Sequence, residues 1–84
     1  MAIKLFHPFG GALLGPVGGV PYMQQVDILA DTEDEITALG GVGSVVQETG
    51  TSMAVKLMAG SMAHTAGYGV IYELSPSGVW TKQA

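Results

Sequence analysis

The chain has 84 residues, enough for one small domain, and it contains no cysteine, so disulfides and thiolate metal sites are excluded. Its net charge is −4 and it has three lysines but no arginine, which argues against nucleic-acid binding because phosphate recognition relies on both residue types. Charged residues make up 12% of the chain and apolar residues 48%. A domain this small buries only about 60–65% of the surface that its unfolded chain exposes. The composition therefore predicts that partners cover part of its apolar surface.

Residues 1–25 are predicted to form an extended arm. Glycines and prolines interrupt this segment repeatedly, and they permit positive φ or remove backbone donors. Residues 5–26 carry no formal charge, but the same interruptions argue against a membrane-spanning helix, which needs about 20 mostly apolar residues. We expect the arm to dock on the surface of another protein, and an irregular loop packed on its own domain is the alternative. The side chains expected to make this contact are Leu5, Phe6, Phe9, Leu13, Leu14, Val17 and Tyr22.

An acidic stretch at residues 26–40 carries the signature of a helix start. Thr32 followed by Glu35 matches a capping box, and acidic residues in the first turn are favoured by the helix dipole. Gly40 is a natural stop after the last turn. A cation site is the alternative reading of these acids, but the stretch lacks the 12-residue calcium-loop pattern. The sequence predicts one short helix at about residues 32–39.

Residues 42–82 have the pattern of short strands separated by turns. We expect strands at 44–48, 53–58, 67–74 and 79–82, although the residue types at 53–58 also favour a helix. A turn with Pro76 at its second position and Gly78 at its end joins the last two strands into a hairpin. The predicted fold is mainly β. It comprises a small antiparallel β-module at residues 26–84 with one short helix, preceded by the extended arm at residues 1–25.

No motif for catalysis or cofactor binding is complete. Gly41 and Gly43 begin a dinucleotide-binding fingerprint, but Val46 stands where its third glycine is required. Gly10 and Gly15 have the spacing of a phosphate-binding loop, but a proline follows where the lysine must be. His64 lies in a predicted loop with no acid near it in sequence, and a catalytic triad requires an orienting acid. The sequence therefore predicts no catalytic residue, no cofactor and no metal site.

A series of short motifs runs from residue 30 to residue 82. It consists of an Ala-Asp opening, a segment ending in small residues, a Gly-Ser-Val strand start, a Tyr-containing strand, and a Gly turn followed by Trp. The residues are Ala30-Asp31, Leu39-Gly40, Gly43-Ser44-Val45, Tyr72-Glu73-Leu74 and Ser77-Gly78-Val79-Trp80. This series resembles the β-structured repeat of head-fibre and other virion-attached proteins of tailed bacteriophages. In that family the first strand leads almost directly into the Tyr-containing strand, whereas this chain has residues 51–67 between them.

The resemblance implies a homotrimeric β-module on a capsid surface, attached to the shell by the preceding arm. The chain would then be a non-enzymatic decoration, cement or head-fibre protein whose partners are the major capsid protein and further copies of itself. The side chains expected between copies are Val45, Val55, Leu57, Val70, Ile71, Tyr72 and Trp80. Two other functions stay open. One is a membrane-active protein that inserts residues 5–22, and the other is a ligand- or glycan-binding β-module that uses Tyr68, Tyr72 and Trp80.

Overall fold

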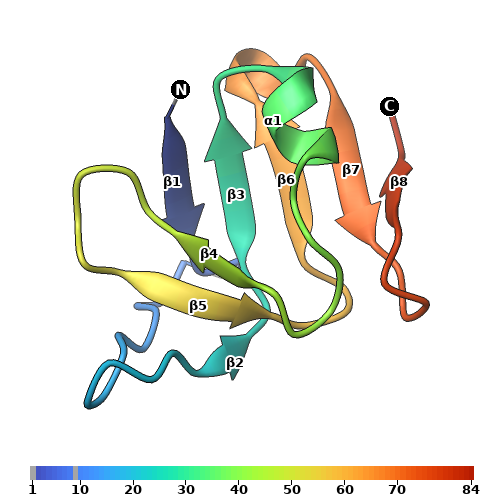
Figure 1. The fold of residues 1–84 in the computed structure, drawn as a ribbon. Helices are drawn as coiled ribbons and strands as arrows, with labels where there is room; N and C mark the ends of the chain where they lie inside the picture. The colour runs from blue at the N-terminus through green and yellow to red at the C-terminus, as the bar shows by residue number, and fades with distance from the viewer. Residues whose placement is uncertain (1, 9) are drawn as a thin grey trace.

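The computed structural model describes residues 2–8 and 10–84, and it consists of two β-sheets and one short α-helix (Figure 1). The larger sheet has the strand order β1 (Ile3–Phe6), β3 (Asp27–Ala30), β6 (Met62–Thr65), β7 (Ile71–Leu74) and β8 (Trp80–Lys82). The smaller sheet has the order β2 (Met23–Gln24), β5 (Ala54–Leu57) and β4 (Val45–Gln47). The predicted mainly β fold with one short helix is confirmed.

The two sheets are mixed rather than purely antiparallel. Four neighbouring pairs are antiparallel, namely β1–β3, β4–β5, β6–β7 and β7–β8. The pairs β3–β6 and β2–β5 are parallel. Parallel neighbours require a long crossover connection, and residues 31–61 supply it for β3 and β6 by way of the helix and the smaller sheet. Only antiparallel neighbours were expected, because turn residues separate the strands that are adjacent in the sequence.

The elements with strong local signals lie where they were predicted. Helix α1 (Glu33–Thr37) begins after Thr32, whose side chain accepts a hydrogen bond from the Glu35 backbone N–H at 3.4 Å. The β7–β8 turn is closed by a bond from the Gly78 N–H to the Ser75 carbonyl at 2.9 Å. The strand expected at 67–74 starts later, at Ile71. The preceding 3₁₀ turn (Ala66–Tyr68) contains residues with positive φ, which an extended strand cannot include.

Three strands of the larger sheet were not predicted. β1 lies inside the expected arm, β3 inside the acidic stretch, and β6 in what was expected to be a loop. The outer edge of β1 is covered by the chain that follows β4. The Thr49 N–H donates to the Ile3 carbonyl at 2.9 Å, and the Glu48 carboxylate accepts from the Leu5 N–H at 2.9 Å. Residues 3–6 therefore belong to the same sheet as β3, and the expected boundary at residue 25 divides that sheet.

The core lies between the inner face of the larger sheet, the helix and the smaller sheet. Helix α1 packs against β3 and β6. The buried apolar side chains are Leu5, Val26, Ile28, Ala30, Ile36, Val46, Val55, Leu57, Ala63, Tyr72 and Leu74. The accessible surface is 4670 Å², and a compact monomeric protein of 8.6 kDa has about 4,700 Å². One copy of the chain is thus as compact as an ordinary monomeric domain.

Candidate functional site

The most exposed apolar segment is a small hairpin at Leu14–Met23, which we call the apolar hairpin. Its tip is a two-residue turn between Val17 and Val20, whose backbone groups exchange hydrogen bonds at 3.1 and 3.0 Å. Gly18 and Gly19 occupy the tip with φ of 59° and 79°. Such a turn requires positive φ at both central positions, which glycine adopts without steric cost. The sequence therefore specifies an ordered turn here instead of a flexible tail.

Two contacts fix the apolar hairpin to the rest of the domain. The Gln24 side-chain amide bonds both backbone groups of Leu14. It accepts from the Leu14 N–H at 2.9 Å and donates to the Leu14 carbonyl at 2.8 Å. The Lys56 N–H donates to the Tyr22 carbonyl at 2.9 Å, beside the parallel pair of β2 and β5. The hairpin is thus held in place by polar groups of its backbone, and its apolar side chains are not needed for that purpose.

Those side chains point to solvent. Five large apolar residues of the hairpin have 45–63% of their surface exposed: Leu14, Val17, Val20, Tyr22 and Met23. A groove of about 470 Å³ adjoins them, lined by Pro16, Gly19, Pro21, Val45, Gln47, Ser52 and Ala54. Val45 of β4 is itself 56% exposed. The hairpin and strand β4 together present an uncharged, apolar and hollowed surface of the kind that marks an interaction site.

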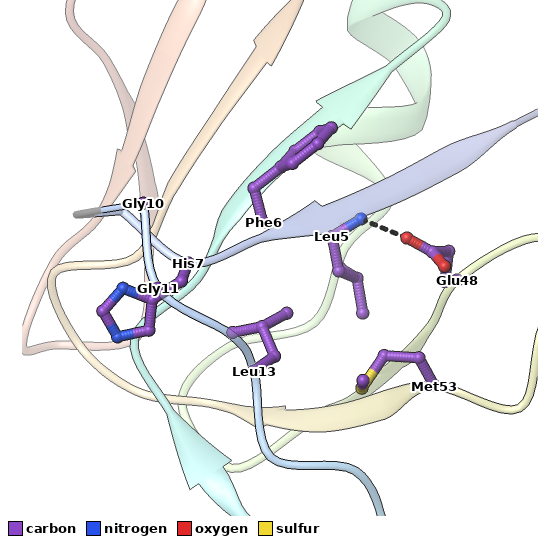
Figure 2. A pocket seen from close by; sticks show the side chains of 8 residues that line it. All are labelled: Leu5, Phe6, His7, Gly10, Gly11, Leu13, Glu48 and Met53. Atoms are coloured by element: carbon purple, nitrogen blue, oxygen red, sulfur yellow. Dashed lines mark hydrogen bonds between the residues drawn. The ribbon is translucent and has the colours of Figure 1, made fainter.

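A second hollow, of about 280 Å³, lies beside β1 (Figure 2). Figure 2 shows Leu5, Leu13 and Met53 converging on one side of it, while Phe6 points to the opposite side of β1. The Glu48 carboxylate is already used, because it accepts from the Leu5 N–H at 2.9 Å and from the Thr51 hydroxyl at 3.0 Å. Small-molecule sites usually have volumes of about 300–1,000 Å³ and several convergent polar groups. This hollow is smaller than such sites, and its one carboxylate serves the fold.

A polar cluster joins helix α1 to β7 and β8. The Tyr72 hydroxyl donates to Glu33 Oε2 at 2.5 Å, and Lys82 Nζ lies 3.1 Å from the same oxygen. The hydrogen bond from Tyr72, and after it the bond from Lys82, lowers the pKa of the Glu33 carboxyl. The bond to Glu33, together with burial, raises the pKa of Tyr72. These contacts stabilise the charged form of Glu33, and they give Tyr72 a structural role inside one copy of the chain.

His64 has the acidic neighbour that its sequence context did not show. Its Nδ1 lies 3.0 Å from Asp27 Oδ1, across the parallel pair β6–β3. The Tyr68 ring stacks on the imidazole with ring centroids 4.3 Å apart. The pairing of β3 with β6, which was not predicted, is what brings this carboxylate to the histidine. His64 is only 8% exposed, and within the described residues its hydrogen-bonding side-chain partner is Asp27, not a serine or threonine hydroxyl.

The expected docking residues are divided by the structure. Leu14, Val17 and Tyr22 lie together on the apolar hairpin, whereas Leu5 is 6% exposed and belongs to the core. Phe6 is 47% exposed, but it lies on the outer face of β1. Two further members of the predicted set are Leu13 and Phe9. Leu13 is half-buried against the core, and Phe9 lies outside the described residues. Val20 and Met23 were not in the predicted set, although both are exposed on the hairpin.

The residues expected between copies are also divided. Val55 and Leu57 are fully buried in the core, and Tyr72 is 8% exposed. Trp80 is half-buried, and its indole N–H donates to the Gly40 carbonyl at 2.9 Å. Val45 on β4 is exposed, and Val70, just before β7, and Ile71, its first residue, are half-buried like Trp80. Side chains covered inside one copy cannot form a contact with another.

Among residues 2–8 and 10–84, no group of three or more His, Asp or Glu side chains is placed to hold a metal ion. No helix within these residues is long and apolar enough to cross a membrane. Comparison with models of protein families, with curated proteins and with solved structures gave no match.

Proposed function

We propose that this chain is a non-enzymatic structural protein of a virion, which docks on the major capsid protein through its apolar hairpin and assembles as a homotrimer on the capsid surface. The observation that carries the docking proposal is the apolar hairpin itself. Five large apolar side chains are 45–63% exposed there, on a turn that backbone hydrogen bonds hold in place. The virion assignment and the trimer are implied by the resemblance to head-fibre and virion-attached proteins.

The physical case for docking rests on preorganisation. Binding orders flexible segments at a cost in conformational entropy, and a surface that is already ordered avoids most of that cost. The hairpin presents apolar side chains next to a groove of about 470 Å³, and covering a patch without charged side chains avoids the large cost of desolvating charges. A partner with a complementary apolar ridge would therefore gain hydrophobic contact without reorganising this protein.

The test is co-sedimentation of the full chain with shells assembled from the major capsid protein of the same virus. The variant replaces exposed apolar side chains by polar ones of similar shape or smaller, namely Leu14→Ser, Val17→Thr and Val20→Thr together. The matched control is Val79→Thr, because Val79 is 59% exposed but lies in the β7–β8 connection. We expect the wild type and the control to pellet with the shells and the triple variant to stay in solution. A wild-type chain that never pellets would contradict the proposal.

The hairpin also favours a second candidate, a membrane-active protein, because an exposed apolar loop can insert into a bilayer interface. Leakage of dye from lipid vesicles on addition of the full chain separates the two candidates, since a docking loop leaves vesicles intact. No observation favours the glycan-binding alternative. Of its three aromatic side chains, Tyr72 is buried and Trp80 is bonded to Gly40, which leaves only Tyr68 open.

A further inference from the structure

The outer face of the larger sheet carries an ordered grid of side chains. The strand registers place Lys4, Leu29, His64 and Ile71 in one row across β1, β3, β6 and β7. The neighbouring row consists of Phe6, Asp27, Met62 and Glu73. Residues that alternate with these along the same strands, such as Ile28 and Ala63, point into the core. The grid is therefore the side of the sheet turned away from the core.

No described strand or α-helix packs on this outer face, although the Tyr68 ring of the 3₁₀ turn stacks on His64 there. Figure 1 shows α1, β4 and β5 together on one side of the sheet. That side is the inner one, because Val46 and Val55 of the smaller sheet share a core cluster with inner-face side chains. Parallel strand pairs are usually covered on both faces, whereas antiparallel sheets can leave one face to water. The parallel pair β3–β6 lies in the middle of this sheet, so an open outer face is unusual for it.

The composition of the grid also differs from that of a solvated face. Four of its eight side chains are apolar: Leu29, Met62 and Ile71, which are half-buried, and Phe6, which is 47% exposed. The two polar groups in the centre satisfy one another, because His64 Nδ1 and Asp27 Oδ1 are 3.0 Å apart. A partner that covers the centre would thus contact apolar side chains and the His64–Asp27 pair, whose polar atoms are already bonded to each other.

Two charges of opposite sign remain near the two sides of the grid. Lys4 is exposed on β1 and Glu73 is exposed on β7. They are separated by three strand spacings, about 14 Å, so they cannot pair within one copy. Within the described residues neither takes part in an ion pair. If two copies meet through this face, the lysine side of one can lie against the glutamate side of the next. The face is thus complementary in charge to itself.

We propose that copies of this chain associate through the outer face of the larger sheet, with Lys4 of one copy against Glu73 of the next. This inference rests on the self-association contained in the proposed function, and it assigns the surface. It differs from the predicted contact, three of whose seven members, Val55, Leu57 and Tyr72, are buried inside one copy. Ile71 is the residue that the two share.

The test is the dissociation constant for self-association, from light scattering of the full chain over a range of concentrations. The variants are Lys4→Glu, Glu73→Lys and the double exchange, all at exposed positions where a change of charge leaves the core untouched. Each single exchange turns an attraction into a repulsion, so we expect it to weaken association roughly tenfold for each contact. We expect the double exchange to return association to within about threefold of the wild type. Single exchanges should lose part of their effect in 1 M salt, because the Debye length falls to about 3 Å.

Three results would overturn the inference: a wild-type chain that is monomeric throughout, single exchanges that leave the constant unchanged, or a double exchange as weak as the two single ones combined. Thermal melting at a concentration where every variant is monomeric serves as the control for folding. Docking on the capsid is tested separately from self-association. If the chain does not bind capsid shells but the charge exchanges still change its self-association as expected, the docking proposal fails and this inference stands.

Discussion

The sharpest test of the fold compares two valines on neighbouring strands. Val55 on β5 is fully buried, whereas Val45 on β4 is 56% exposed, and both were expected to lie between copies. Val55→Ala removes two methyl groups from the core, at about 0.8 kcal/mol each. The cavity left behind adds up to about 1 kcal/mol at about 24 cal/mol per Å³. The predicted loss of unfolding free energy is therefore about 1.6–2.6 kcal/mol. Val45→Ala should stay within about 0.5 kcal/mol of the wild type.

Urea and thermal unfolding of the monomeric chain measure this difference. With a urea slope of about 1 kcal/mol per M for a domain of this size, the midpoint of Val55→Ala should fall by about 2 M. Its Tm should fall by about 6–20 °C, since each kcal/mol shifts a small domain by about 4–8 °C. Equal stability of the two variants would refute the packing argument. A Val55→Ala chain with unchanged stability and weakened association would return Val55 to the interface.

Three further predictions concern the contacts that hold helix α1 and the loop after it. Glu33→Gln should lower Tm at pH 7, and this loss of Tm should shrink as the pH falls below about 4.5. The lowered pKa of Glu33 means that its contribution is present above the unfolded value of about 4.5 and is lost as the pH falls through the folded value; a Tm difference that stays constant with pH would contradict this. Thr32→Ala removes the helix cap and should cost about 1 kcal/mol in urea unfolding, while Thr32→Ser should cost much less. Gly41→Ala should cost about 1–3 kcal/mol, because a Cβ there would lie 2.7 Å from the Gly78 carbonyl oxygen; a silent substitution in thermal melting would show that this contact relaxes freely.

The sequence predicted those parts of the fold that local chemistry determines. The capping pair Thr32 and Glu35 located the helix, and the turn before Gly78 located the last hairpin. The larger sheet could not be predicted in the same way, because β3 and β6 are separated by 31 residues and their parallel pairing depends on the elements between them. β6 contains small and polar residues, which carry no strong strand signal without the neighbours that pack on them.

The candidate site was predictable only as a segment, and not residue by residue. Leu5 and Phe6 are adjacent and both apolar, yet the first is 6% exposed and the second 47%, because alternate side chains of a strand point to opposite faces. Val45 and Val46 differ in the same way, at 56% and 7% exposed. The sequence indicated that this region is rich in apolar residues. The direction of each side chain depends on strand register, which the composition of the segment does not determine.

The short length of the chain was taken to mean a thin core, and its low charge was taken to mean that partners cover part of its apolar surface. The structure gives that composition a different meaning. One copy has the accessible surface expected for a compact monomer of its mass, 4670 Å². The excess of apolar residues is instead displayed on the apolar hairpin and on the outer face of the larger sheet, which carry different side chains. The proposed association is then a docking of units that are already folded. Changes on either surface should weaken its own contact and leave both the stability of the single copy and the other contact unchanged, because sites without shared partners act additively.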